Sequence, residues 1–242
     1  AALYGPSVVD YGFVKIEEET DYPFSGKIRF RFNLKEQKSF AFTYRVPVWC
    51  RGHADCGKFV TVERTFSDGD TLDLDFPMET VFEKAAPRRY VVKDATVPKP
   101  LLLNGASGSQ GVVVRRGPLV FAFPIVERRT EDTLTHEELH GKVSGEPDFK
   151  CWNLDPAGPF NYALARHEAK VTCRVSASGA FTLSGSPLLI SVPVKRIRWG
   201  LDGGRYTPDL PESVEAISDA EEVINLVPYG ATCLRLSVFP EL

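Results

Sequence analysis

The stretch KIRFRFNL, residues 27–34, alternates strictly between polar and apolar side chains. Its apolar residues, Ile28, Phe30, Phe32 and Leu34, fall on one side of an extended chain. The lysine, arginine and asparagine side chains between them fall on the other side. A period of two is typical of a β-strand that buries one face in a core. The stretch therefore predicts a half-buried strand in a layered β fold.

The same alternation recurs farther along the chain. It appears in FAFTYRVPV, residues 40–48, and in LDLDF, residues 72–76, which follows the turn sequence SDGD at residues 67–70. Asp-Gly between alternating runs is a strong hairpin signal, because glycine adopts positive φ without steric cost. We therefore expect residues 67–70 to join two strands of a hairpin, within an antiparallel β region.

The composition changes at residues 97–110, VPKPLLLNGASGSQ, where prolines, glycines and serines replace the alternating pattern. Such a segment is either a linker or a long loop between strands. We place the expected domain boundary inside it, between residues 104 and 105.

Alternating runs resume after this segment, in AKVTCRVS (169–176), LLISVPVKRIRW (188–199) and TCLRLSVF (232–239). Many short strands separated by turn signals favour β-sandwiches, and no long amphipathic helix interrupts them. We therefore expect an all-β fold with little helix. It would consist of two consecutive antiparallel β-sandwich domains of jelly-roll or immunoglobulin-like type, residues 1–104 and 105–242.

The composition limits the possible partners. The chain has 242 residues and a formal net charge of −3, which argues against the broad basic field of a nucleic-acid-binding protein. No apolar run approaches the ~20 residues that span a bilayer, so no membrane partner is expected. The first residues, AALYGP, show neither an initiator methionine nor a signal-peptide pattern, and we expect them to lie inside a longer protein.

One catalytic motif is present by pattern: HEELH, residues 136–140, fits the H-E-x-x-H of zinc peptidases. On a long helix His136 and His140 would bind zinc, with Glu137 as the general base. No third ligand has a distinctive spacing. The motif is therefore the least favoured of the functional readings.

The residues around this motif favour a short capped turn instead. Thr135 and Glu138 have the spacing of a capping box, and Gly141 is a helix stop. Paired carboxylates for glycoside hydrolysis also show no informative spacing among the acidic residues. No catalytic residue and no metal ligand is assigned in this chain.

The five cysteines form no C-x-x-C pair. Cys50, His53 and Cys56 lie close in sequence, and three states stay open for these cysteines: a metal site, a disulfide or free thiols. Because the run lacks a fourth ligand at a usual spacing, free thiols are the favoured state and a metal site the least favoured.

Three aromatic residues are candidates for contact with a sugar ring or with another domain: Trp49, Trp152 and Tyr162. An aromatic face packs well against the C–H surface of a sugar. For Trp49, which follows an alternating run, packing within the protein is the favoured alternative.

Several strings together resemble a known family. LYGPSVV, EEETDYPFSGKIRF, FTYRVPVWC, SDGDTLDLDFPME and VVRRGPLVFAF occur in this order, followed by FNYAL, VPVKRIRWG and LVPYGATCLRLSVFP. Their order and spacing resemble the C-terminal portion of the DUF1680 proteins, glycoside hydrolase family 127 with its relative family 146. Characterised members of this family are β-L-arabinofuranosidases.

The resemblance implies a neighbour that this chain lacks. In the family an (α/α)6 barrel precedes two β-sandwich domains, and the barrel holds the catalytic glutamate and a zinc-bound cysteine cluster. None of the cysteines here matches a catalytic position, so the zinc would belong to the barrel and this chain would need no cofactor. By analogy with exported sugar-degrading relatives, a secreted or periplasmic location is expected.

The sequence thus predicts an accessory, non-catalytic part of a family-127-like glycoside hydrolase that supports or orients the barrel. The alternative is a carbohydrate-binding module for an arabinose-containing plant glycan. The zinc peptidase remains a remote third possibility.

Overall fold

The computed structural model describes residues 1–85, 90–91, 102–103, 111–142, 145, 148–175, 179–201, 210–211 and 213–242. The chain forms two compact units. Unit 1 consists of residues 1–81 and 115–120, and unit 2 consists of residues 82–114 and 121–242. The described residues are mostly β-strands, so the all-β prediction is confirmed. The expected boundary between residues 104 and 105 lies outside the described residues and stays a prediction.

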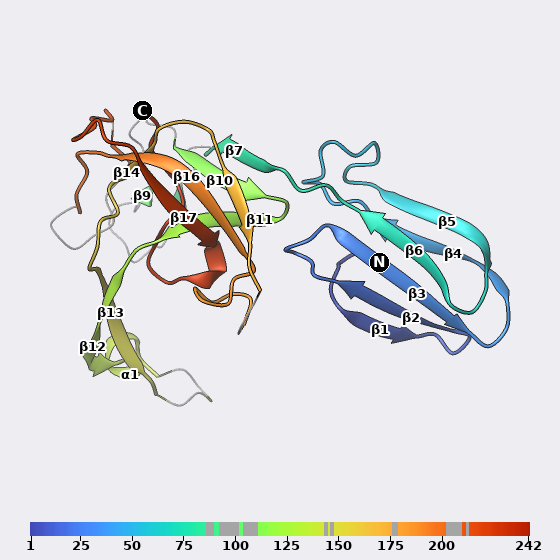
Figure 1. The fold of residues 1–242 in the computed structure, drawn as a ribbon. Coiled ribbons are helices and arrows are strands. Elements are labelled where there is room, and N and C mark those ends of the chain that lie inside the picture. The colour runs from blue at the N-terminus through green and yellow to red at the C-terminus, as the bar shows by residue number, and fades with distance from the viewer. Residues whose placement is uncertain are drawn as a thin grey trace. The chain divides into compact units, whose positions relative to one another are not determined.

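Unit 1 contains two antiparallel sheets, labelled in Figure 1. The first has the strand order β1-β2-β3-β6, and the second pairs β4 with β5. The quoted stretch is β3, whose apolar residues are buried while Lys27 and Arg29 are exposed, as predicted. The bounds are β1 Ser7–Asp10, β2 Val14–Thr20, β3 Lys27–Leu34, β4 Lys38–Arg45, β5 Phe59–Phe66 and β6 Asp70–Asp75.

Aromatic side chains from both sheets form the core of unit 1. Phe32 of β3 meets Phe42 of β4 edge to face, with ring centroids 5.2 Å apart, and Phe66 of β5 at 4.5 Å. Phe30 lies 4.9 Å from the same Phe42. Because the rings of β3 contact those of β4 and β5, the two sheets pack face to face as a sandwich.

The turn at residues 67–70 does not close a hairpin, so that prediction is wrong. β5 before the turn pairs with β4, whereas β6 after the turn pairs with β3 in the other sheet. Asp68 accepts a hydrogen bond from the Leu34 N–H at 2.9 Å, and Asp70 accepts one from the Ser67 N–H at 3.0 Å. The Asp68 carboxylate holds the turn against the end of β3 and the Asp70 carboxylate closes the turn itself, at the point where the chain crosses from one sheet to the other.

The main sheet of unit 2 has the strand order β14-β16-β17-β11-β10-β7, with β15 also paired to β16 and β18 to β11. Ile190, Val192 and Val194 of β16 are buried, as the alternation in its sequence predicts, and Pro193 between them is buried as well. The bounds are β7 Thr80–Lys84, β10 Val112–Arg116, β11 Leu119–Pro124, β14 Tyr162–Leu164, β15 Lys170–Cys173, β16 Leu188–Arg196, β17 Glu222–Pro228 and β18 Arg235–Leu236. A separate short pair joins β8, Tyr90–Val91, to β9, Leu102–Leu103.

Residues 239–242 join separate parts of this sheet. Val112 of β10 exchanges backbone hydrogen bonds of 2.7 and 2.8 Å with Phe239. Leu164 of β14 donates to the Pro240 carbonyl at 2.9 Å and accepts from Leu242 at 3.2 Å. Because β14 begins the strand order and β10 lies near its other end, these bonds curl the sheet on itself.

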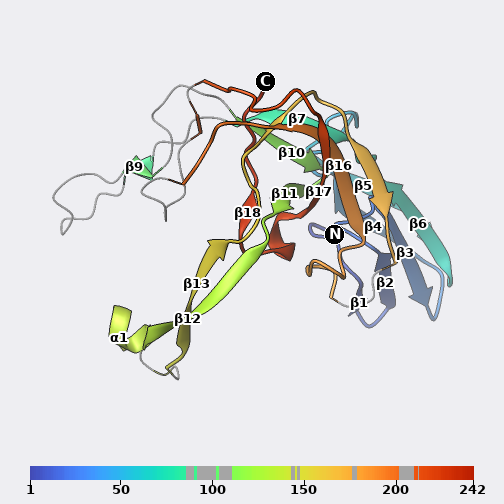
Figure 2. The same ribbon diagram turned by 60° about the vertical axis from the view of Figure 1, so that its left-hand side comes forward.

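A two-stranded ribbon leaves the body of unit 2. It consists of β12, Glu127–Thr135, paired with β13, Lys150–Pro156, and it carries helix α1, His136–His140, at its far end. Figures 1 and 2 show the ribbon extending away from the other strands of unit 2. Among the described residues, no helix has the length and apolar character required to span a membrane.

Candidate functional site

Trp49 lies in the loop after β4 and packs inside unit 1. Its indole ring stacks on Tyr22 with centroids 6.4 Å apart and meets Phe76 edge-on at 6.3 Å. The indole N–H donates to the Tyr22 hydroxyl at 3.4 Å. Tyr4 contacts the same two partners, at 5.6 Å from Tyr22 and 5.5 Å from Phe76. Because these aromatic neighbours occupy its surroundings, Trp49 is part of an internal cluster in this structure.

A buried carboxyl group lies in the same unit. Glu18 of β2 is only 8% exposed and accepts hydrogen bonds from the Gly5 N–H at 3.0 Å and from the Ser7 hydroxyl at 3.4 Å. Burial raises the pKa of Glu18 above its ordinary value, because the charged form is desolvated. The period of two identifies this residue, since Val14 and Ile16 precede Glu18 on one face of the strand. The sequence alone showed no informative spacing among the acidic residues and did not single out Glu18.

The raised pKa of Glu18 gives a testable pH dependence. The folded protein binds this proton more tightly than the unfolded chain, so the contribution of Glu18 to stability declines as pH rises from the ordinary carboxyl pKa through the raised folded value. Glu18→Gln keeps a hydrogen-bond acceptor but removes this titration. As pH rises through this range, we expect the unfolding free energy of Glu18→Gln to increase relative to that of the wild type. Urea unfolding between about pH 4 and pH 8 measures it.

Two controls show whether the pH dependence of stability comes from Glu18. Asp73, whose pKa the Arg29 hydrogen bond lowers, titrates alike in both proteins and cancels in the difference. Glu18→Ala, which removes the acceptor of the Gly5 N–H, is expected to cost about 1–2 kcal/mol. A pH-independent difference between wild type and Glu18→Gln would contradict the assignment.

Trp152 has a different environment, on the ribbon of unit 2. Its side chain is 55% exposed and it pairs across the ribbon with Glu131. The ammonium of Lys150 lies 2.5 Å from the Glu131 carboxylate, and the guanidinium of Arg129 lies 2.5 Å from Glu127. Side chains two residues apart on a strand point to the same face, so Glu127, Arg129 and Glu131 of β12 and Lys150 of β13 lie on the same face of the ribbon as Trp152. Trp152 is therefore an exposed ring among charges that neutralise each other.

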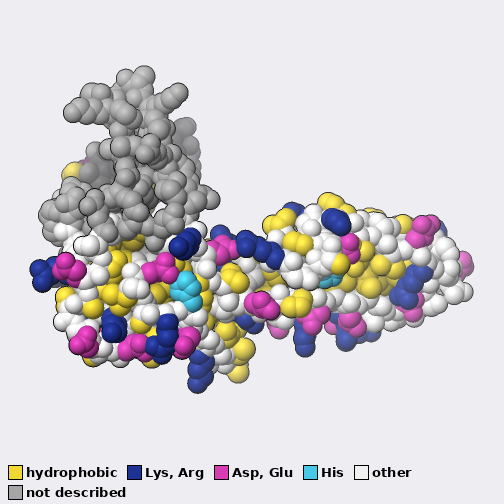
Figure 3. Space-filling model, turned by 90° about the horizontal axis from the view of Figure 1, so that it is seen from above, with side chains coloured by type: hydrophobic (Ala, Val, Ile, Leu, Met, Phe, Trp, Pro, Cys, Tyr) yellow, Lys and Arg dark blue, Asp and Glu magenta, His cyan; other side chains and the backbone are white. Residues whose placement is uncertain are grey.

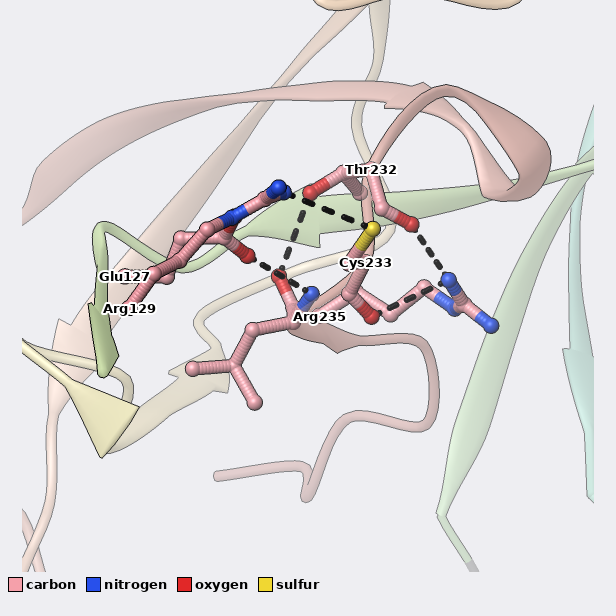
Figure 4. A network of polar contacts seen from close by, with 6 residues as sticks. Glu127, Arg129, Thr232, Cys233 and Arg235 are labelled. Carbon is pink, nitrogen blue, oxygen red and sulfur yellow. Dashed lines mark hydrogen bonds and ion pairs between the residues drawn. The ribbon is translucent and has the colours of Figure 1, made fainter. Parts of the chain in front are cut away.

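The base of the ribbon is held by the polar network drawn in Figure 4. Glu127 accepts hydrogen bonds from Arg129 and from the Leu234 N–H at 3.3 Å, and Arg129 also donates to the Cys233 sulfur at 3.7 Å. Arg235 donates to the carbonyl of Cys233 at 3.1 Å. The network ties β12 to the segment before β18, which fixes the position from which the ribbon leaves the sheet.

Tyr162 is buried in β14 and is only 4% exposed. Its ring meets Phe123 edge to face at 5.3 Å, and the guanidinium of Arg196 lies 5.4 Å from the ring centroid. The hydroxyl donates to Glu222 at 3.3 Å. The structure therefore places Trp49, Trp152 and Tyr162 in three different environments, and Trp152 is the exposed one of the three.

The HEELH motif forms the capped turn that the sequence predicts. The Thr135 hydroxyl accepts from the Glu138 N–H, and the Glu138 carboxylate accepts from the Thr135 N–H at 2.8 Å, which completes the capping box. The ring of His136 stacks on Phe149 at 4.5 Å. The side chain of His140 lies outside the described residues.

Within the described ranges, no three His, Cys, Asp or Glu side chains lie close enough together to hold a metal ion. The donor set of a zinc site is thus not found in this part of the chain, and we assign no chemical step to a metal here. On the face that Figure 3 shows, acidic and basic side chains of the described residues are interspersed rather than gathered into one field.

Comparisons with known proteins show what the chain is similar to. Residues 1–78 match the family model of the β-L-arabinofuranosidase GH127 middle domain. The comparison with curated proteins finds no significant match. Among solved structures, a GH127 β-L-arabinofuranosidase from Geobacillus stearothermophilus T6 covers 99% of this chain with 33% of its own, with a TM-score of 0.55 and 21% identity.

Two further solved structures show the same likeness. A GH127 β-arabinofuranosidase matches with a TM-score of 0.54 and 18% identity, covering 99% of this chain and 34% of its own. A structure described as a glycoside hydrolase matches with a TM-score of 0.54 and 19% identity, covering 99% and 35%. The chain spans about a third of the length of each of these structures, and at this identity they show the fold. Residues 1–78 are therefore similar to a GH127 middle domain, and the chain is a GH127-like all-β region.

Proposed function

We propose that this chain is an accessory β-sandwich region of a β-L-arabinofuranosidase-like glycoside hydrolase, and that it supports the catalytic barrel without catalysing the reaction itself. The match of residues 1–78 to a domain named for its middle position carries the proposal, because a middle domain has neighbours in the chain. In this proposal the catalytic residues and the zinc belong to the (α/α)6 barrel upstream.

The exposed edge of the first sheet in unit 1 is consistent with a neighbouring barrel domain. Among the strands that the structure describes, β1 pairs only with β2, and it is exposed along its length. Val8 is 60% exposed, and Tyr11 and Phe13 in the turn after β1 are also exposed. An uncovered apolar edge strand can pair with another chain and cause aggregation, unless another part of the protein covers it. We propose that the barrel covers this edge in the longer polypeptide.

Assays of the isolated chain and of the longer polypeptide test the proposal. The isolated chain is expected to show no turnover of aryl β-L-arabinofuranosides, and measurable turnover would overturn its accessory role. In the longer polypeptide, Val8→Glu is expected to weaken the contact with the barrel and to lower turnover about tenfold, because it places a charge in an apolar interface. Thr71→Glu, at the exposed opposite edge of the same sheet, is the matched control. Equal activity of the two variants would remove β1 as the contact.

The exposed Trp152 favours a second candidate function, binding of an arabinose-containing glycan. The paired charges around Trp152 leave its face without net charge, which suits a neutral sugar ring stacked on the indole. The contact would involve the ribbon rather than the core of unit 2.

Calorimetric titration of the chain with arabinan and arabinogalactan tests this candidate. Trp152→Ala is expected to weaken binding about tenfold, which corresponds to the loss of one aromatic contact, whereas Trp152→Phe retains a ring and most of the affinity. An absence of heat with the wild-type chain at millimolar sugar would exclude the candidate.

A further inference from the structure

Residues 46–58, VPVWCRGHADCGK, form a closed loop in unit 1, here named the cysteine loop. Its ends meet through the Val46 N–H bonded to the Lys58 carbonyl at 2.8 Å and the Gly57 N–H bonded to the Val46 carbonyl at 3.1 Å. The loop contains two of the five cysteines, Cys50 and Cys56, and both are free thiols in this structure. The loop also carries Trp49.

Two successive turns connect the two cysteines. The His53 N–H donates to the Cys50 carbonyl at 3.0 Å, and the Cys56 N–H donates to the His53 carbonyl at 3.1 Å. The chain then returns to its start, because the Cys56 thiol donates to the carbonyls of Val48 at 3.3 Å and of Pro47 at 3.7 Å.

A shared acceptor shows how close the residues lie. The Pro47 carbonyl that accepts the Cys56 thiol also accepts the Cys50 N–H, at 3.1 Å. The Cys56 sulfur and the Cys50 backbone therefore flank the same oxygen atom. Burial raises the pKa of Cys50, and the nearby Cys56 raises it further. A disulfide requires the two residues to approach closely, with Cα atoms within about 7 Å, and the shared Pro47 carbonyl is the contact that holds Cys56 beside Cys50.

We propose that Cys50 and Cys56 form an intramolecular disulfide when the protein meets a low-molecular-weight disulfide such as oxidised glutathione. The Cys56 thiolate attacks one glutathione sulfur, forming a mixed disulfide and releasing one glutathione thiolate. The Cys50 thiolate then attacks the Cys56 sulfur, closing the protein disulfide and releasing the second glutathione. Two protein thiols are oxidised, the glutathione disulfide is reduced to two thiols, and the two protons pass to them.

The order of the two steps follows from how exposed each thiol is to the oxidant. Cys56 is partly exposed, so a small disulfide can reach it, whereas Cys50 is 3% exposed and reacts from inside the loop. The product cross-links the chain on either side of His53 and next to Trp49. Because it constrains the unfolded chain, it is expected to raise the Tm of the protein by about 5 °C.

Peptide mapping of the full chain tests the proposal. The protein is incubated with oxidised glutathione, quenched with acid, alkylated with iodoacetamide and cut with trypsin. Trypsin cleaves after Arg45, Arg51 and Lys58, so Cys50 and Cys56 fall on separate peptides, residues 46–51 and 52–58. We expect these two peptides to be recovered joined by a disulfide.

The other cysteines and two variants serve as controls. Cys173 and Cys233 are exposed, so glutathione on either shows that the oxidant has acted. If these sites are glutathionylated while residues 46–51 and 52–58 appear only as separate alkylated or glutathionylated peptides, the proposal is overturned. Cys50→Ser is expected to accumulate the mixed disulfide at Cys56, and Cys56→Ser to leave Cys50 unmodified. Neither variant should show the rise in Tm.

Discussion

Phe32→Ala is expected to lower the free energy of unfolding of unit 1 by about 3–5 kcal/mol, enough to unfold most of a domain of ordinary stability. Phe32 is fully buried and its ring contacts Phe42, Phe66 and Phe40, with centroids 5.2, 4.5 and 6.1 Å away. Truncation removes the side chain that joins β3 to both strands of the second sheet and leaves a cavity between the layers. Urea unfolding followed by circular dichroism measures the loss.

Phe59→Ala is the matched control for this substitution. Phe59 is the same residue type at the start of β5, but its side chain is 61% exposed, so truncation there should change stability by no more than about 0.5 kcal/mol. Similar losses for the two variants would show that the sheets of unit 1 do not pack around Phe32 as described.

Gly26→Ala is expected to destabilise unit 1 by about 2–4 kcal/mol, because it combines overpacking with a lost backbone hydrogen bond. A Cβ atom at residue 26 would lie 1.9 Å from the carbonyl oxygen of Phe76, a backbone atom that no side-chain rotation can move away. The same two residues are joined by the Phe76 N–H donating to the Gly26 carbonyl at 3.0 Å. Relieving the clash would separate the start of β3 from the segment after β6.

Gly52→Ala distinguishes this clash from a general cost of replacing glycine. A Cβ at residue 52 meets no atom within 4 Å, so the variant should be as stable as the wild type or slightly more stable. Thermal unfolding of both variants gives the comparison. Equal Tm values would mean that the chain relaxes at Gly26 without breaking its bond to Phe76.

The layered β fold could be predicted from the sequence because a strand that buries one face has an apolar residue at every second position. β3 shows it most clearly: each apolar position of the quoted stretch is buried. Which strands pair with one another is not visible in this alternating pattern. The Asp-Gly turn at residues 67–70 joins different sheets, and Asp68 bonds there to the Leu34 N–H at the end of β3, a contact with a distant residue that the turn sequence does not predict.

The candidate site was less predictable, because exposure depends on contacts between distant segments. Trp49 and Tyr162 are enclosed by Tyr22 and Phe76 and by Phe123 and Arg196, and these neighbours are far from them in sequence. Trp152 differs because its ribbon has few neighbours beyond its own two strands. The roles proposed for these residues stay predictions until binding is measured.

The ribbon has a consequence for how proteins of this type can vary. It is joined to unit 2 at one end, where the Ala157 N–H donates to the Val126 carbonyl at 2.7 Å and Glu127 bonds to Leu234. Beyond that junction, the backbone hydrogen bonds of the described residues lie within the hairpin itself. A lineage can therefore lengthen, shorten or replace residues 130–153, beyond the bond from Arg129 to Cys233, without rebuilding the sheet, and insertions and deletions among homologues are expected to gather there.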